Sequence, residues 1–184
     1  AVKKLILRTD LLIFTFGLTE AWVHKASGTV YATAPETIAG KYSPEIHEFK
    51  NFTFNEIYRD FVKLRTILKV KRPNMKFLVT VSPVPLTATA SNRHVLSATI
   101  YSKSVLRAVA GQIEAEFDDT DYFPSYEMIA SHPSRGRHYD DNLRSIKEEG
   151  VSTAMAVFLE QHPPVSVATE EPTKERARND VCED

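Results

Sequence analysis

Two short apolar runs without alternation limit the folds open to this chain more than any other feature. Residues 11–16 (Leu-Leu-Ile-Phe-Thr-Phe) and residues 76–81 (Lys-Phe-Leu-Val-Thr-Val) have the length of β-strands. Their lack of a polar face is typical of strands that are buried on both sides, as in parallel sheets covered by helices. A third, shorter strand is predicted over residues 121–124. The pattern therefore favours an α/β domain.

Helical patterns alternate with these strands. Residues 53–56 (Thr-Phe-Asn-Glu) and residues 145–148 (Ser-Ile-Lys-Glu) have the sequence of capping boxes, which predict two helix starts. Apolar side chains at helical spacing predict another helix over residues 98–117, and residues 1–8 are typical of the end of a helix. This alternation of helix and strand predicts a three-layer α/β/α fold with a parallel sheet.

We expect one domain followed by a tail. Residues 1–162 hold all of the periodic segments, whereas residues 163–184 are rich in Pro, Thr, Glu and Arg and predict disorder. Three strands make a thin sheet, with a long, flat and apolar edge of the kind that natural proteins avoid. We therefore expect either that strands before Ala1 have been lost by N-terminal truncation, or that self-association or a second chain covers this edge.

Composition argues against several classes of protein. The formal net charge of −1, with scattered Lys and Arg, argues against a nucleic-acid partner. No apolar run approaches the ~20 residues of a membrane span, and no signal peptide is visible, so we expect a cytoplasmic protein without a membrane partner. The single cysteine, Cys182, excludes an internal disulfide. The six histidines lie far apart, and no nucleotide-binding motif occurs, so neither a metal nor a cofactor is expected.

Polar side chains follow the first strand directly. Thr19, Glu20 and Trp22 come just after residues 11–16, which we expect to form the central strand. Ligands bind at the carboxyl ends of the strands in open α/β sheets. A carboxylate in a partly apolar pocket is suited to proton transfer, which makes Glu20 the first candidate for a catalytic group. Alternatively, Glu20 pairs with a Lys or Arg and only orders the loop.

Three motifs, in this order, resemble those of the GSCFA-domain family. They are Phe-Gly-Leu-Thr-Glu-Ala-Trp at residues 16–22, Val-Ser-Pro-Val-Pro-Leu-Thr-Ala-Thr at 81–89 followed by Tyr-Ser-Lys-Ser-Val-Leu-Arg-Ala-Val-Ala-Gly at 101–111, and Asp-Tyr-Phe-Pro-Ser-Tyr-Glu at 121–127. The resemblance covers roughly residues 10–158. That family resembles the SGNH (GDSL-like) hydrolases. The resemblance therefore implies a flavodoxin-like fold and an ester hydrolase or O-acyltransferase that acts on a carbohydrate or other hydroxyl-rich small molecule.

The resemblance also implies roles for particular residues. The nucleophile is expected in a Gly-Ser-Cys-Phe-Ala segment, which these 184 residues do not contain. Thr19 stands where SGNH enzymes carry an Asn that donates to the oxyanion. Those enzymes take their catalytic His from an Asp-x-x-His motif, but residues 140–145 hold no His. Either His132 or His138 can then supply the base, or both are surface-loop histidines. A non-catalytic carbohydrate-binding or assembly protein is the alternative.

Further side chains are candidates for substrate binding. Ser82 and Tyr126 follow two predicted strands, and we expect them within reach of Glu20. Lys103 can bind an anionic group or remain solvated, Tyr126 can line the cleft or pack on the sheet, and Arg144 can clamp a carboxylate or cap the last helix. The predicted substrate-binding residues are Trp22, Ser82, Ser102, Lys103, Tyr126, Glu127 and Arg144, beside the catalytic candidates Thr19, Glu20 and His132.

Overall fold

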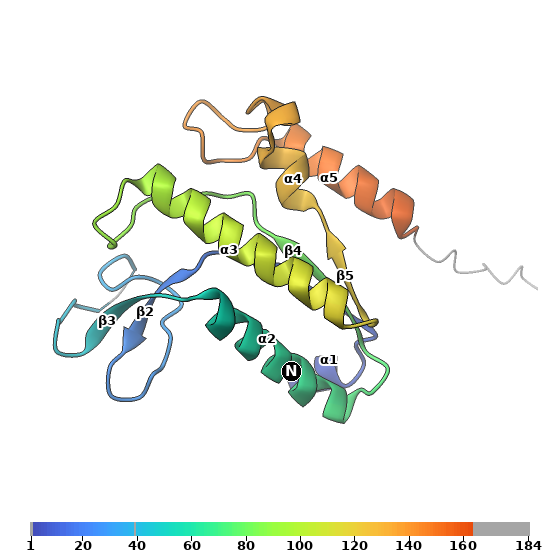
Figure 1. Cartoon of the computed structure of the whole chain (residues 1–184), viewed down its shortest axis with the longest axis horizontal. Helices are drawn as coiled ribbons and strands as arrows, with labels where there is room; N and C mark the ends of the chain where they lie inside the picture. Colours follow the sequence, from blue (N-terminus) through green and yellow to red (C-terminus); the bar gives the residue numbers. More distant parts are fainter. Residues whose placement is uncertain (1, 39, 164–184) are drawn as a thin grey trace, which may run out of the picture.

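A three-stranded parallel sheet forms the centre of the fold, with β4 (Lys76–Val81) between β1 (Leu11–Phe16) and β5 (Thr120–Phe123). The computed structural model describes residues 2–38 and 40–163, and the tail predicted to be disordered lies outside them from residue 164 onward. The strands predicted from the two apolar runs are confirmed with their predicted bounds. All three strands end at the same edge of the sheet (Figure 1).

Helices and a second, antiparallel sheet surround these strands. A capping box at Thr53 and Glu56 opens the first long helix, as predicted, and the helix predicted over residues 98–117 begins three residues earlier, at Val95. The other elements are α1 (Val2–Ile6), β2 (Glu20–His24), β3 (His47–Asn51), α2 (Phe54–Lys71), α3 (Val95–Glu116), α4 (Ser125–Ala130), the 3-10 turn His132–Ser134 and α5 (Glu148–Gln161).

Helices cover both faces of the parallel sheet. One face carries α2 and α3 (Figure 1). Alternate residues of β4 form the buried core with side chains of both helices. On the other face lie α4 and α5, and the ring of Phe158 in α5 packs at 5.6 Å on that of Phe123 in β5. The predicted three-layer α/β/α arrangement is therefore confirmed. The core residues are Phe16, Phe61, Leu68, Met75, Phe77, Val79, Val81, Leu106, Val109, Ala110 and Ile113.

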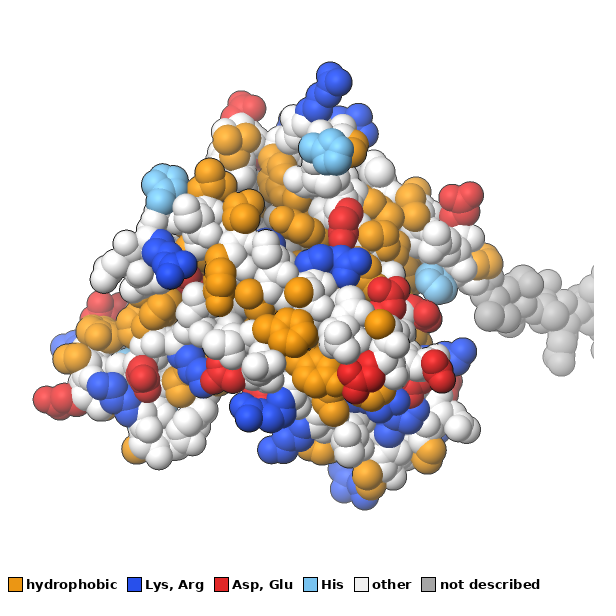
Figure 2. All heavy atoms as spheres, viewed as in Figure 1, with side chains coloured by type: hydrophobic (Ala, Val, Ile, Leu, Met, Phe, Trp, Pro, Cys, Tyr) orange, Lys and Arg blue, Asp and Glu red, His pale blue; other side chains and the backbone are white. Residues whose placement is uncertain are grey.

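The solvent side of these helices mixes charges of both signs. In Figure 2, Lys and Arg side chains lie between Asp and Glu side chains over the lower part of the face, with apolar groups among them. The two signs nearly cancel in the whole chain, whose formal net charge is −1. On this face, therefore, no broad field of one sign surrounds the helices.

The prediction that residues 11–16 form the central strand is wrong for the described sheet. β4 takes the central position, and β1 lies at an edge. The crossovers explain this order, because α2 and α3 cover the same face and each carries the chain to the next position in the same direction. On the α5 side of β1, Leu11 and Ile13 stay 41% and 51% exposed.

The region between β1 and α2 holds the second sheet, in which β2 and β3 pair antiparallel, and of residues 28–33 only Val30 makes a bridge. One further prediction needs correction. The capping box predicted at residues 145–148 does not form. The Ser145 hydroxyl instead accepts a hydrogen bond from the Asn142 amide at 2.9 Å, and α5 begins after Lys147 without a side-chain cap.

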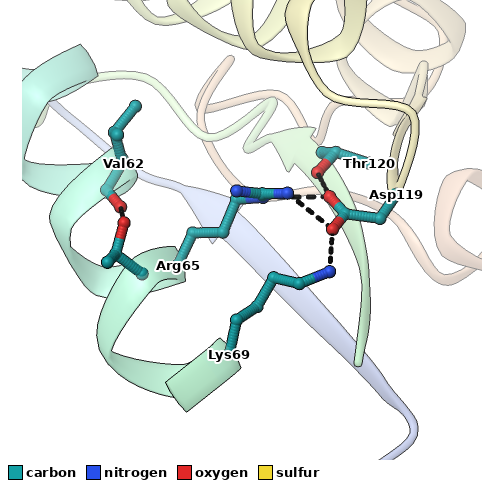
Figure 3. Close-up of polar contacts among 6 residues, drawn as sticks. Val62, Arg65, Lys69, Asp119 and Thr120 are labelled. Atoms are coloured by element: carbon teal, nitrogen blue, oxygen red, sulfur yellow. Dashed lines mark hydrogen bonds and ion pairs between the residues drawn. The ribbon is translucent and has the colours of Figure 1, made fainter. Parts of the chain in front are cut away.

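An ion-pair cluster fastens α2 to the amino-terminal edge of the sheet (Figure 3). Arg65 binds both carboxylate oxygens of Asp119 at 2.9 and 2.6 Å, and Lys69 donates to the same carboxylate. Asp119 directly precedes β5, and its carbonyl accepts from the backbone N–H of Phe77 in β4 at 2.9 Å. Burial alone would raise the pKa of Asp119, but the hydrogen bonds from Arg65 and Lys69 outweigh it and lower this pKa from 3.8 to about 2.

We expect Asp119→Asn to lower the free energy of unfolding at neutral pH. A pKa depressed from 3.8 to about 2 corresponds to about 2 kcal/mol, which is fully present above pH 3.8 and is lost as the pH falls toward 2. Urea unfolding at neutral pH and at steps down to pH 2 measures both effects. The difference between wild type and variant should shrink through that window.

The exposed neighbour Asp118 offers a matched control. Asp118→Asn removes an equal charge one residue away, outside the ion-pair cluster, and we expect it to change stability by less than about 0.5 kcal/mol. Equal losses in the two variants would show that the ion pairs do not stabilise the fold.

Candidate functional site

A cleft of about 360 Å³ opens beyond the carboxyl ends of β1 and β4. Its walls come from the β2–β3 pair, from residues 31–34 and from residues 86–90, which follow β4. The lining mixes aromatic rings, small apolar side chains and a few hydroxyls. We call this the Glu20 cleft, and the residues that line it are Glu20, Ala21, Trp22, Tyr31, Ala32, Thr33, Ala34, Phe49, Leu86, Ala88, Thr89 and Ala90.

Helix α3 anchors the turn that carries Glu20. The hydroxyl of Ser102 accepts a hydrogen bond from the backbone N–H of Thr19 at 2.9 Å, and the ammonium of Lys103 donates to the carbonyl of Gly17 at 2.8 Å. On the other side, the carbonyl of Thr19 accepts from the backbone N–H of Phe52 at 2.8 Å. Thr19, Ser102 and Lys103 are at most 1% exposed, so they position the turn and do not line the cleft.

Lys103 is held at this place against the cost of burial. Removal from water lowers the pKa of its ammonium from 10.5 to about 8. Among the described residues, the Gly17 carbonyl accepts a hydrogen bond from this ammonium. One carbonyl offsets only part of the lost hydration. The buried Lys103 ammonium therefore fixes the end of β1, but its burial lowers the free energy of unfolding.

Glu20 is tied to the loop that follows β4. The hydroxyl of Thr89 donates to Glu20 Oε1 at 2.8 Å, and the backbone N–H of Ser91 donates to the same hydroxyl at 3.0 Å. Beside this network the Trp22 ring meets the ring of Phe49 at 5.8 Å and that of Tyr42 at 5.4 Å, both edge to face. The cleft thus places a half-buried carboxylate next to an aromatic wall.

Two predicted binding residues lie on α4, away from the Glu20 cleft. The carboxylate of Glu127 binds Arg107 at 2.6 Å and accepts from the Tyr122 hydroxyl at 2.7 Å, while the Arg107 guanidinium stacks 4.0 Å over the Tyr122 ring. Tyr126 is half-buried against the core, and burial together with the Glu127 carboxylate raises its pKa. Figure 1 shows α4 well apart from β2 and β3.

The other candidates also lie outside the lining of the cleft. The Ser82 hydroxyl accepts from the backbone N–H of Val84 at 3.2 Å. His132 is exposed in the 3-10 turn, and Arg144 is exposed in the loop before α5. The structure therefore brings together Glu20 and Trp22 at the cleft, with Thr19, Ser102 and Lys103 behind them, but not Ser82, Tyr126, Glu127, His132 or Arg144.

His138 is not the surface histidine that its loop suggested. It is 2% exposed, and Gly150 of α5 packs so closely on it that a Cβ there would come within 2.9 Å of His138 Cβ. The Arg137 side chain donates to its Nε2 at 3.3 Å. Within the described residues its Nδ1 is buried without a hydrogen-bond partner. Packing of α5 on the loop explains the burial.

Sequence reasoning missed three of the residues that shape the cleft. Phe49 and Tyr31 complete the wall beside Trp22, and Thr89 holds Glu20. Residues 47–51 (His-Glu-Phe-Lys-Asn) hold one apolar side chain among four polar ones, so no apolar–polar alternation marked Phe49 as part of a strand. Thr89 ends the motif at residues 81–89, but nothing in that motif indicates a contact with Glu20, which lies 69 residues away.

Comparisons with known proteins place the chain in a family. The model of the GSCFA family matches residues 1–158. The searches of curated proteins and of solved structures found no match. In the part of the chain that the structure describes, no group of three or more His, Cys, Asp or Glu is placed to hold a metal ion, and no helix has the length and apolarity to cross a membrane.

We expect Lys103→Met to change how stability depends on pH. Because the folded-state pKa of about 8 lies below the ordinary 10.5, the unfolded chain binds more protons between these values, and Lys103 makes stability rise with pH there. The full span corresponds to about 3 kcal/mol. Melting temperatures from pH 7 upward should show wild type gaining on the variant as the pH rises toward 10.5.

Lys63→Met serves as the control, because Lys63 is exposed on α2. The same tyrosines are present in every variant, so only differences between proteins are compared. Parallel curves for wild type and Lys103→Met would contradict a buried, charged Lys103.

Proposed function

We propose that this chain, which belongs to the GSCFA family, binds a carbohydrate or other hydroxyl-rich small molecule in the Glu20 cleft and takes part in its ester hydrolysis or O-acyl transfer. One observation carries the proposal. A carboxylate oriented by a hydroxyl stands beside Trp22, Tyr31 and Phe49 in an open cleft of about 360 Å³. Such pockets combine apolar walls with a few placed polar groups, and sugars offer the matching apolar ring faces and hydroxyls.

Glu20 is the group proposed to contact the reacting hydroxyl. Its Oε1 is engaged by Thr89, which leaves Oε2 to accept a hydrogen bond from a ligand. A carboxylate in this position can orient a substrate hydroxyl or take its proton as an ester bond forms or breaks. Trp22 and Phe49 would pack on the ring of the substrate and limit access of water.

The ester chemistry rests on the resemblance to SGNH hydrolases, which is an argument by analogy. Its nucleophile is expected in a Gly-Ser-Cys-Phe-Ala sequence, and the 184 residues do not include one. The residues that line the described cleft include no Ser–His or Cys–His pair. That observation favours the second candidate function, in which the cleft binds carbohydrate without catalysis.

The binding part of the proposal has a built-in reporter. Trp22 is the sole tryptophan of the chain and lies in the cleft wall, so ligand binding should change the intrinsic fluorescence. We expect saturable changes with short oligosaccharides. Glu20→Gln should weaken binding by about 10- to 100-fold, because a neutral amide oxygen replaces the charged acceptor. Fluorescence that is indifferent to every oligosaccharide would contradict the proposed site.

Glu48→Gln is a matched control for this substitution. Glu48 is exposed and precedes Phe49 on β3, so its side chain projects from the opposite face of the same strand pair. The change removes the same charge from the same small sheet. We expect unchanged affinity.

The catalytic part is tested with short-chain esters and a fluorophosphonate probe on the full-length protein. Glu20→Gln should lower turnover by about 10²- to 10⁴-fold if the carboxylate acts in proton transfer. Absence of both turnover and labelling would leave the non-catalytic binding protein. Near-full turnover in Glu20→Gln, with only a lower melting temperature, would make Glu20 a scaffold residue.

A further inference from the structure

The charge of the Glu20 cleft is one-sided. Among the residues that line it, Glu20 is the charged one, and the others are aromatic, small apolar or hydroxyl-bearing. No described Lys or Arg forms an ion pair with Glu20. The nearest basic residue on the strand pair, Lys50, is engaged with Glu56 at 2.8 Å. A half-buried carboxylate without a counter-charge is costly, and a cationic ligand would remove that cost.

The aromatic wall adds a second attraction for a cation. The faces of Trp, Tyr and Phe rings are electronegative and attract an ammonium group within about 6 Å of the ring centre. The Trp22 ring stands at 66° to that of Phe49 and at 72° to that of Tyr42. Rings at such steep angles make a corner instead of a flat shelf, and of these three rings those of Trp22 and Phe49 line the cleft.

The hydrogen-bonding groups around Glu20 offer acceptors. Asn51 pairs with Glu20 across β2 and β3, so both side chains project from the same face. Within the described residues, Asn51 Oδ1 is buried without a hydrogen-bond partner; Asn51 does not line the cleft, so this oxygen adds negative polarity beside Glu20 without contacting a ligand. The Thr89 hydroxyl donates its one hydrogen bond to Glu20, so toward a ligand it can act only as an acceptor. A protonated amine carries three donors and no acceptor, and it complements such surroundings better than a neutral hydroxyl does.

We propose that the ligand of the Glu20 cleft presents a protonated amine to Glu20, which makes the substrate class a hydroxyl-rich cation such as an amino sugar with a free amino group. The ammonium binds Glu20 Oε2 and lies in the corner formed by Trp22 and Phe49. The hydroxyls of the same ligand reach Thr33 and the loop that carries Thr89. The assignment of the amine rests on the proposed function only in taking the rest of the ligand to be a carbohydrate.

A matched pair of ligands tests the assignment. Glucosamine oligomers and N-acetylglucosamine oligomers of equal length differ in whether the amine is free, and Trp22 fluorescence of the whole 184-residue chain reports binding of both. At a pH that keeps the free amines protonated, we expect the glucosamine oligomer to bind about 10- to 100-fold more tightly. The preference should weaken with added salt.

Two variants locate the effect. Glu20→Gln should abolish the preference for the free amine, whereas Glu48→Gln should keep it. Melting temperatures confirm that both variants are folded. An unchanged preference in Glu20→Gln would overturn the assignment.

The remaining outcomes separate this inference from the proposed function. Equal or tighter binding of the acetylated oligomer overturns the amine assignment and leaves the carbohydrate site standing. Choline, an ammonium without a sugar ring, is the third ligand. If it binds as tightly as the glucosamine oligomer, the cation site is supported and the carbohydrate part of the proposed function fails. If none of the three binds, both proposals fail.

Discussion

The position of the Glu20 cleft depends on two hydrogen bonds between α3 and the turn after β1. The Ser102 hydroxyl accepts a hydrogen bond from the backbone N–H of Thr19, and the ammonium of the next residue, Lys103, donates one to the carbonyl of Gly17. Both side chains are buried, and the ammonium is held without a described counter-ion. These two contacts determine where β2 begins, and therefore where the carboxylate of Glu20 points. The remaining contacts of the cleft are arranged around that position.

The charged groups at the two edges of the parallel sheet have different surroundings. At the amino-terminal edge, Asp119 binds Arg65 and Lys69 and joins α2 to the start of β5. The carboxyl edge instead holds the buried ammonium of Lys103, the half-buried carboxylate of Glu20 and an amide oxygen of Asn51 that has no hydrogen-bond partner within the part of the chain that the structure describes. The Glu20 cleft lies on the same side as these polar groups, beyond the carboxyl ends of β1 and β4, where ligands of open α/β sheets bind.

Local patterns in the sequence were enough for the parallel strands, for the capping box at Thr53 and for the choice of Glu20 and Trp22 as candidates after the first strand. Each depends on residues a few positions apart. The order of the strands cannot be predicted from neighbouring residues, because it depends on which face of the sheet the crossover helices cover. For this reason the edge position of β1 was not predicted. The burial of Ser102 and Lys103 was equally out of reach, since only the packing of α3 on the sheet decides it. Tyr126 and Glu127 follow a strand just as Glu20 does, yet α4 carries them to another cluster.

The contacts that complete the cleft also join distant parts of the chain. Glu20 and Thr89 are 69 residues apart, and Gly17 and Lys103 are 86 apart. Closing such long segments costs chain entropy before any contact repays it, so these contacts form slowly. The β2–β3 pair can assemble early, but the opposite wall has to wait for β4 and α3. Because β1 pairs with β4 over a similar length of chain, the cleft is completed by the same kind of long-range contact that completes the sheet.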